Sequence, residues 1–419
     1  MTQEDHGPEQ AQGGALSESQ KRNMRVVAYA LTVLATFSLG VTEIFAPWYA
    51  GVLGASPWEM GWAMGSFGVV YMFSPAIGGK VSDRIGRRNA LLVATTSYMT
   101  LLLIYPQPFV TPIHLIVIRA LEGLFFGLYY PSIEGLVAEL SPASQVAVLG
   151  NFSSSWSAGM VLSPMVIAYM SQTFGNVSSI YVVLGVELFS LALIFLFIGG
   201  YRPEQVINTV APDAGRAADL AMDRKTGRQT RTSPKFIASF VSVAMFGFIS
   251  TLLLALYPTY IETLPGYTAV DFGALLMTWN ISRTLTFASI SRLRKEHMEL
   301  VMLMGGGVSS VSMLMIWGSQ VYLVLWLASV MCGIGVGCAY LAALYVVVSA
   351  TDIEKGAHAG LVESLAGVGF FIGPVFGGWI AGGDTGSSLP YLATALYSAV
   401  SLLVIAVLLR KSRRHTPIV

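Results

Sequence analysis

The sequence predicts an all-α integral membrane protein with twelve transmembrane helices arranged as two pseudo-symmetric six-helix bundles. Three observations support this fold class: an apolar composition, a series of membrane-length apolar segments and an internal repeat. Of the 419 residues, 54% are hydrophobic and only 11% are charged, whereas a soluble domain carries about a quarter charged residues. A chain of this composition is solvated mostly by lipid.

Twelve segments are apolar over a length that can span a bilayer, when hydropathy is averaged over about 19 residues. Their ranges are 25–48, 60–79, 89–106, 113–137, 145–171, 179–200, 235–260, 268–290, 298–317, 321–349, 358–382 and 389–409. The longest polar interruption, 201–234, falls after the sixth segment. We therefore expect a domain order of disordered cytoplasmic tail, first bundle, cytoplasmic linker, second bundle and tail, at 1–23, 24–200, 201–234, 235–410 and 411–419.

An internal repeat supports the division into two halves, because adding 210 to a residue number maps the first half onto the second without gaps. Glycine, proline and tyrosine positions coincide under this single offset, which pairs Gly123 with Gly333, Gly127 with Gly337, Gly159 with Gly369, Pro164 with Pro374 and Tyr181 with Tyr391. A constant offset of this kind predicts two parallel, structurally similar bundles.

The distribution of cations predicts the orientation in the membrane. With the N-terminus in the cytoplasm, 22 of the 24 lysines and arginines lie in cytoplasmic tails, loops or the linker. The other two, Arg119 and Arg283, lie within spans, which leaves the external loops without a cation. Loops rich in lysine and arginine stay on the cytoplasmic side. Both termini are therefore expected on the cytoplasmic side of the cell (plasma or inner) membrane.

The stretch 79–88, GKVSDRIGRR, carries four cations between two apolar runs, so we expect a short loop in water in which Asp83 caps a helix or pairs with an arginine. It resembles the loop between the second and third helices of the major facilitator superfamily, G-x-x-x-D-R-x-G-R-R. The matching positions are Gly79, Asp83, Arg84, Gly86, Arg87 and Arg88. The resemblance implies a transporter that moves a small molecule by alternating access. It also implies that this segment latches the two bundles on the cytoplasmic side in the outward-facing state.

Charges within the spans are costly and require a partner or a function. Arg119 and Glu122 share one face of the fourth span, and Glu43 lies at a similar depth in the first. We hypothesise that Arg119 holds Glu43 or Glu122 ionised and that one of them carries a coupling proton, since burial favours the neutral form and the arginine the charged form. The alternative is a local Arg119–Glu122 ion pair. The segment resembles the R-x-x-Q-G motif of proton-coupled branches of the superfamily, with Glu122 in place of glutamine.

A second group of charges is predicted nearer the cytoplasm: Arg283 in the eighth span, Glu134 in the fourth and Glu363 in the eleventh. In the family that the signature stretch resembles, the eighth and eleventh helices line the central cavity. Arg283 is therefore expected to meet an anionic group of the substrate or to pair with Glu363. A gate salt bridge without substrate contact explains the same residues equally well.

The eleventh span contains G-x-x-x-G-P-x-x-G-G, formed by Gly369, Gly373, Pro374, Gly377 and Gly378. Small residues permit close helix packing and the proline bends the helix. The run resembles the fifth-helix motif of the antiporters of the superfamily, but the copy in the fifth span is degenerate. We predict a bendable eleventh helix, with plain packing as the alternative.

No grouping of side chains predicts a metal site, a cofactor or an enzyme. Aromatic and polar residues, among them Trp48, Trp156, Trp279 and Asn280, fill several expected cavity helices, which suits an organic solute. Proton-driven efflux is therefore the first hypothesis, proton-coupled uptake of an organic anion the second and a transporter-like solute sensor the third. The expected partners are a small-molecule substrate, protons and the lipid bilayer, and no nucleic acid. The protein is expected to be a monomer.

Overall fold

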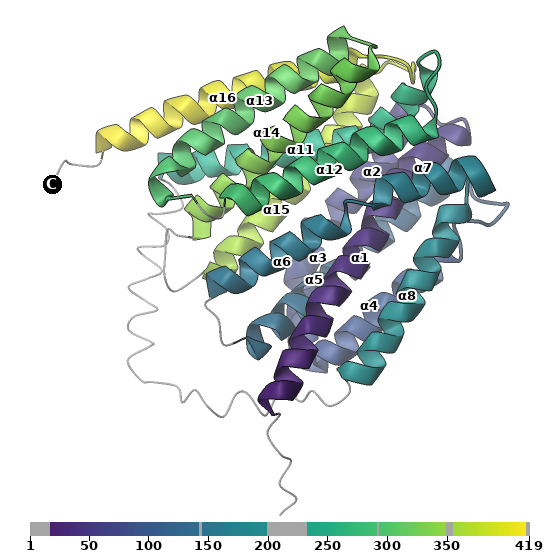
Figure 1. Ribbon diagram of the computed structural model, residues 1–419, viewed down its shortest axis with the longest axis vertical. Helices are drawn as coiled ribbons and strands as arrows, with labels where there is room; N and C mark the ends of the chain where they lie inside the picture. The colour runs from purple at the N-terminus through teal and green to yellow at the C-terminus, as the bar shows by residue number, and fades with distance from the viewer. Residues whose placement is uncertain (1–16, 142–144, 199–232, 291–292, 349–354, 416–419) are drawn as a thin grey trace, which may run out of the picture.

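The computed structural model describes residues 17–141, 145–198, 233–290, 293–348 and 355–415, which form helices and turns with no strand among them (Figure 1). The helices of the first half are α1 (Glu18–Val52), α2 (Pro57–Tyr71), α3 (Ser74–Ile85), α4 (Arg87–Leu102), α5 (Pro112–Leu140), α6 (Gln145–Gly159), α7 (Ser163–Phe174) and α8 (Ser178–Phe197). Those of the second half are α11 (Pro234–Thr263), α12 (Ala269–Ile290), η1 (Lys295–His297), α13 (Met298–Gly318), α14 (Tyr322–Val348), α15 (Lys355–Ile380) and α16 (Leu389–His415).

Each of the twelve predicted spans coincides with a helix or with two consecutive helices. Seven of the described helices are long and apolar enough to cross a membrane, namely α1, α5, α8, α11, α13, α14 and α16. The other spans correspond to the shorter or more polar α4, α12 and α15 and to the pairs α2–α3 and α6–α7. The predicted membrane fold of two six-span bundles is confirmed.

Two spans are interrupted where a proline follows. Pro75 stands in the first turn of α3 and Pro164 in the first turn of α7. Proline has no N–H to donate to the preceding turn and fits the start of a helix. One helix therefore ends shortly before each proline, and the next helix begins only a few residues later.

The end helices extend further than the sequence predicted. The Oγ of Ser17 accepts a hydrogen bond from the Gln20 backbone N–H, and the Gln20 side chain accepts one from the Ser17 N–H, which forms a capping box. Residues 18–23, expected in the tail, are therefore the first turns of α1. Residues 411–415 likewise continue α16, whereas linker residues 201–232 and the outermost tails lie outside the described residues.

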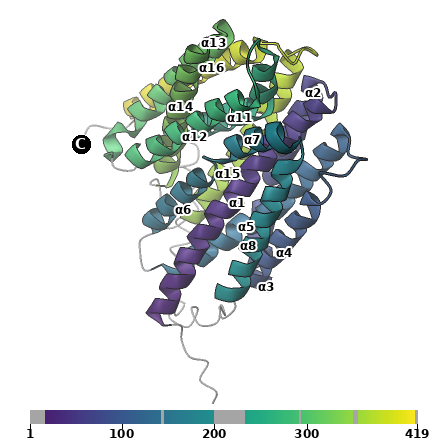
Figure 2. The same ribbon diagram turned by 45° about the vertical axis from the view of Figure 1, so that its right-hand side comes forward.

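The two bundles form a V in Figures 1 and 2, and they converge near α2 and α7. We call the side where α1 begins and α16 ends the terminal side, and the other the opposite side. Glycines allow close contact on the opposite side: a Cβ on Gly61 of α2 would lie 3.1 Å from Val375 Cα of α15, and one on Gly273 of α12 would lie 3.0 Å from the carbonyl oxygen of Pro164 in α7. Gly61 also packs against Pro374, the repeat-related partner of Pro164, so equivalent helices form both contacts.

Ion pairs on the terminal side connect helices of the same bundle. In the first bundle, Arg87 pairs with Glu139 at 3.0 Å. In the second, Glu299 forms ion pairs with Lys235 at 2.9 Å and with Arg413 at 2.8 Å. These contacts brace each bundle separately, which agrees with bundles that meet on the opposite side and diverge toward the terminal side.

Candidate functional site

The candidate site lies within the first bundle, where α2 and α3 pack closely on α5 through small residues. Ser74 Oγ donates a hydrogen bond to the Gly123 carbonyl at 2.7 Å. A Cβ on Gly123 would lie 2.7 Å from the Phe67 carbonyl oxygen, and one on Gly78 would lie 2.7 Å from Leu128 Cα. Only glycine permits these backbone approaches, which bring side chains of α2 against the arginine of α5.

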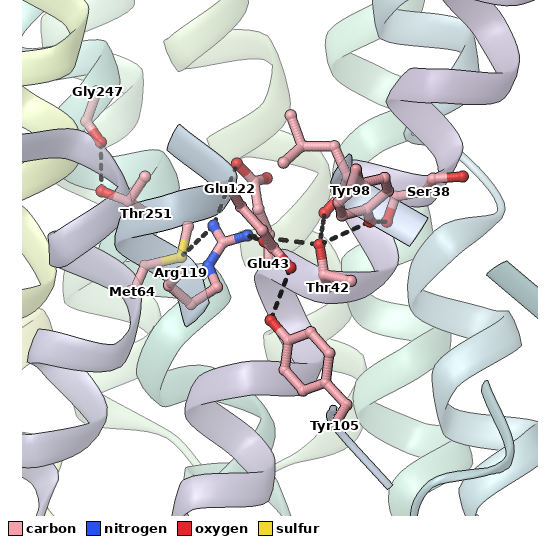
Figure 3. Close-up of polar contacts among 11 residues, drawn as sticks. Ser38, Thr42, Glu43, Met64, Tyr98, Tyr105, Arg119, Glu122, Gly247 and Thr251 are labelled. Carbon is pink, nitrogen blue, oxygen red and sulfur yellow. Dashed lines mark hydrogen bonds and ion pairs between the residues drawn. The ribbon is translucent and has the colours of Figure 1, made fainter. Parts of the chain in front are cut away.

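Arg119 is fully buried and contacts side chains of α1, of α2 and of its own helix, α5 (Figure 3). Its Nη1 donates to Glu122, its neighbour one turn along α5, and lies 3.4 Å from Thr42 Oγ1 of α1. Its Nη2 lies 3.9 Å from Met64 Sδ, and the guanidinium lies 4.6 Å from the centre of the Phe67 ring. The cation is thus held by one carboxylate, one hydroxyl and an aromatic face.

Glu122 is the more firmly bound of the two acids. Its Oε2 accepts from Arg119 and its Oε1 accepts a hydrogen bond of 2.8 Å from the Tyr105 hydroxyl, which follows α4. The side chain of Glu122 is 0% exposed. Both oxygens of this carboxylate therefore have donors, which stabilises its charged form in a buried place.

Glu43 is held less tightly. Its Oε1 lies 3.9 Å from Arg119 Nη2, beyond hydrogen-bond distance, and its side chain keeps 9% of its exposure. Arg119 thus faces two carboxylates, of which Glu122 takes the short contact. The sequence grouped Arg119, Glu43 and Glu122, and the structure brings all three together, as Figure 3 shows.

A chain of hydroxyl groups leads away from this cluster. Thr42 Oγ1 lies 3.3 Å from the Tyr98 hydroxyl, which also donates to the Ser38 carbonyl at 3.2 Å. Glu187 of α8, a further buried acid, lies within electrostatic range of Tyr98. The sequence did not indicate Tyr98 or Tyr105 as site residues, because tyrosines are common in membrane helices and only packing shows which of them face a charge.

Arg283 on α12 occupies a different environment. It is 1% exposed, and its guanidinium carbon lies 4.8 Å from the Trp279 ring centre and 5.2 Å from that of Trp156 on α6. It interacts electrostatically with Glu43, a link to the first charge group that residue counting did not predict. The Glu363 side chain lies outside the described residues, so its pairing with Arg283 stays a prediction, and Glu134 is partly buried on α5.

Comparison with known proteins identifies the family. The sequence matches the profile of the Major Facilitator Superfamily over residues 28–300 and 298–418. The chain belongs to this superfamily. An uncharacterized MFS-type transporter of Methanocaldococcus jannaschii is 24% identical over 360 residues, which cover 84% of this chain and 89% of that protein.

Two relatives from Staphylococcus aureus carry names that state a function. The staphyloferrin B transporter is 24% identical over 357 residues, 82% of each chain. The quinolone resistance protein NorA is 22% identical over 177 residues, 41% of this chain and 44% of NorA. The chain is therefore similar both to a transporter and to a drug resistance protein.

Solved structures support the same fold. A bacterial homologue of the human lysosomal transporter Spinster, in an inward-facing and unoccupied conformation, has a TM-score of 0.73 at 11% identity and covers 96% of this chain and 100% of that one. The nucleoside transporter NupG has a TM-score of 0.71 at 14% identity and covers 93% and 99%. At such identities the likeness concerns the fold alone.

Residues 79–88, here called the signature segment, are helical except at Gly86, which corrects the expectation of a loop. Gly79, Asp83 and Arg84 belong to the last turns of α3, and α4 begins at Arg87. Only Gly86 is non-helical, with a φ of +87° that favours glycine. Asp83 and Arg84 are exposed, so the last turn of α3 can form without an apolar partner for them.

Arg87 is the centre of contacts in that segment. It pairs with Asp83 at 2.6 Å and with Glu139 of α5 at 3.0 Å, and donates to Ser82 Oγ at 3.0 Å. A Cβ at residue 135 would lie 2.7 Å from the Arg87 guanidinium, so Gly135 provides the room. The predicted pairing of Asp83 with an arginine is present, and these partners all belong to the first bundle.

The glycine-rich run of α15 lies in helix contacts on two sides. Cβ atoms on Gly369 and Gly373 would lie 2.7 and 2.8 Å from backbone atoms of Phe248 on α11, and one on Gly378 would lie 2.8 Å from the carbonyl carbon of Pro57 on α2. Gly377 faces the side chain of Leu252 on α11. Pro374 lies inside α15, which is a single helix from Lys355 to Ile380. Close packing is thus visible, and bending of this helix during transport stays a prediction.

Proposed function

We propose that this superfamily member is a proton-coupled secondary transporter that works by alternating access. It exports a small organic solute from the terminal side to the opposite side. The observation that carries the proposal is that one buried arginine faces two buried carboxylates. A guanidinium compensates one carboxylate, so a second one beside it is neutralised most readily by a proton.

Glu43 is the carboxylate that we assign to the coupling proton. Glu122 has both the Arg119 contact and the Tyr105 hydroxyl, whereas Glu43 is 3.9 Å from the arginine and remains slightly exposed. When a rearrangement of α1 against α5 within the first bundle brings Arg119 closer to Glu43, the charged form of Glu43 is favoured and the proton leaves. When they separate, the neutral form gains and a proton binds.

The direction of transport is inferred from charge and similarity. The terminal side is proposed to face the cytoplasm, because tails and loops there hold the lysines and arginines. The similarity to a quinolone resistance protein supports export of an amphipathic compound.

The proton assignment is tested with full-length protein in proteoliposomes on a solid-supported membrane, where a pH jump displaces charge as protons bind. We expect Glu43→Gln to reduce the displaced charge at least about fivefold, because it removes the titrating group. Glu59→Gln is the matched control, since Glu59 is exposed and caps α2 through Ser56. A Glu43→Gln protein with the wild-type charge displacement would show that the assignment is wrong, and loss in Glu122→Gln alone would move it to Glu122.

The direction is tested by loading proteoliposomes with a fluorescent quinolone and imposing pH gradients of both signs. For molecules whose terminal side faces the lumen, export predicts that the quinolone leaves the lumen as protons enter. Movement of quinolone that ignores the gradient in both the wild type and Glu43→Gln would refute proton coupling.

A second candidate is proton-coupled uptake of an organic anion. It is favoured by Arg283, a buried cation that lies against two indole rings. The similarity to a staphyloferrin B transporter along 82% of each chain is compatible with it. Accumulation of benzoate in the lumen, driven by protons moving in the same direction, would support this candidate over export.

A further inference from the structure

Arg283 has hydrogen-bonding capacity that the described part of the protein does not use. Its Nε and Nη2 are buried and have no hydrogen-bond acceptor there, although the residue is only 1% exposed. A buried guanidinium without an acceptor costs free energy, so a protein keeps one where another state or a ligand supplies the partner.

The two indole rings stabilise the cation without neutralising it. Arg283 lies over Trp279, which is four residues earlier on the same helix, and over Trp156, which comes from the other bundle. Cation–π contacts favour the positive charge but provide no acceptor in the guanidinium plane. The charge of Arg283 therefore remains available to an anion.

The unpaired atoms are arranged for one kind of anion. Nε and Nη2 form one edge of the planar guanidinium, and their N–H groups point in parallel, as the two oxygens of a carboxylate require. Asn280, three residues before Arg283 and on the same helix face, leaves its Oδ1 without a partner as well. An N–H or O–H group of a bound molecule would satisfy that oxygen.

We propose that the Nε–Nη2 edge of Arg283 binds the carboxylate of an aromatic organic acid, whose ring packs on Trp156 and Trp279. That this acid is the transported solute rests on the proposed transport function, whereas its binding does not. Because Trp156 and Arg283 belong to different bundles, the ligand joins the two halves of the protein. Trp156 is partly exposed and Trp279 is buried, so the α6 side of the site opens to admit the ligand.

Glu43 is the competing partner for Arg283. The two residues interact electrostatically, but the ion-pair contact of Glu43 is with Arg119. If the bundles shifted so that Glu43 satisfied Arg283, the arginine would be structural and would need no ligand. The stability of the ligand-free protein distinguishes these two roles.

The experiment measures thermal unfolding of the full-length protein in detergent with three acids, benzoate, phenylacetate and indole-3-acetate, and with their uncharged amides. We expect at least one acid to raise the Tm of the wild type by about 2 °C or more beyond its amide, because a ligand that binds only the folded state stabilises it. The difference should disappear in Arg283→Gln and weaken in Arg283→Lys, which keeps the charge but loses the parallel N–H pair. Arg294→Gln, at an exposed position, is the control and should respond like the wild type.

Ligand-free protein provides the second measurement. The Tm of Arg283→Gln should equal or exceed that of the wild type, because the substitution removes a buried charge without an acceptor. The proposal is overturned if no acid stabilises the wild type more than its amide, if the stabilisation persists in Arg283→Gln, or if that variant has a lower Tm without ligand. Acid binding that persists in Glu43→Gln separates this site from the proton assignment, which can fail independently.

Discussion

Replacing Gly61 by alanine should force the two bundles apart on the opposite side. The new Cβ would lie 2.9 Å from the Pro374 carbonyl carbon and 3.1 Å from Val375 Cα, whereas carbon atoms pack best at about 3.5–4.0 Å. Backbone atoms cannot rotate away, so α2 and α15 must separate by about 0.5–1 Å to relieve the overlap. Overpacking of this kind costs about 1–3 kcal/mol.

That cost applies only to the arrangement in which α2 and α15 are in contact. A conformation with the bundles separated on the opposite side does not incur it, so the equilibrium should shift toward that conformation by about 5- to 150-fold. The same substitution leaves the contacts within each bundle in place. We therefore expect a change of population without loss of the fold.

Spin labels at Phe109 and Gln320 report this change, because both positions are exposed and lie in opposite-side turns of different bundles. The two buried cysteines, Cys332 and Cys338, are first replaced by alanine. The measured distribution of distances between the two spin labels should gain a longer component in Gly61→Ala. Identical distributions in the substituted and unsubstituted proteins would refute the packing argument.

Gly185→Ala is the matched control for this experiment. A Cβ at that position meets nothing within 4 Å, and alanine favours a helix over glycine by about 1 kcal/mol. The control should therefore be at least as stable as the parent and keep its distance distribution. A longer component in Gly185→Ala as well would show that alanine substitution acts through something other than the contact of α2 with α15.

Three further substitutions test individual contacts. Trp48→Phe removes the 2.8 Å hydrogen bond from the indole to Glu262 between α1 and α11, and should raise the separated population about tenfold, since hydrogen bonds to charged groups contribute about 1.5–3 kcal/mol; unchanged spin-label distances would contradict this. Glu299→Gln weakens two ion pairs on the terminal side and should lower the free energy of unfolding by about 1 kcal/mol. Denaturation at low and at high salt measures this loss. An equal loss at both salt concentrations would contradict the assignment to ion pairs. Asp83→Asn removes the 2.6 Å pair with Arg87. If the signature segment latches the arrangement that is closed on the terminal side, this substitution should favour the arrangement that is open there. Unchanged distances between spin labels on the terminal side would exclude the latch.

Much of the site membership could be predicted from the sequence, but not the role of each residue. Arg119, Glu122 and Glu43 are conspicuous because charges are rare in apolar spans, and counting from the loops placed them at one depth. Which acid takes the short contact depends on Tyr105, whose hydroxyl reaches Glu122 from the end of α4. No periodicity in the sequence indicates that contact.

Arg283 illustrates the limit of counting along a helix. Its position in the eighth span suggested a separate group near the cytoplasm, yet it interacts electrostatically with Glu43 and lies against Trp156 of the other bundle. The contact of α6 with α12 brings Trp156 and Arg283 together. Depth along one helix therefore does not state which residues of another helix lie beside it.

The sequence by itself determined the membrane fold, the twelve spans, the duplicated halves and the family, because hydropathy, charge distribution and a short motif are properties of the chain read residue by residue. Tertiary structure decided that the signature segment is helical, that the glycines of α15 face both α11 and α2, and that Glu43 is the more loosely held acid. The physical reason is that a helix advances about 1.5 Å per residue, so depth follows from counting. Its rotation and its neighbours follow only from how side chains of several helices pack together.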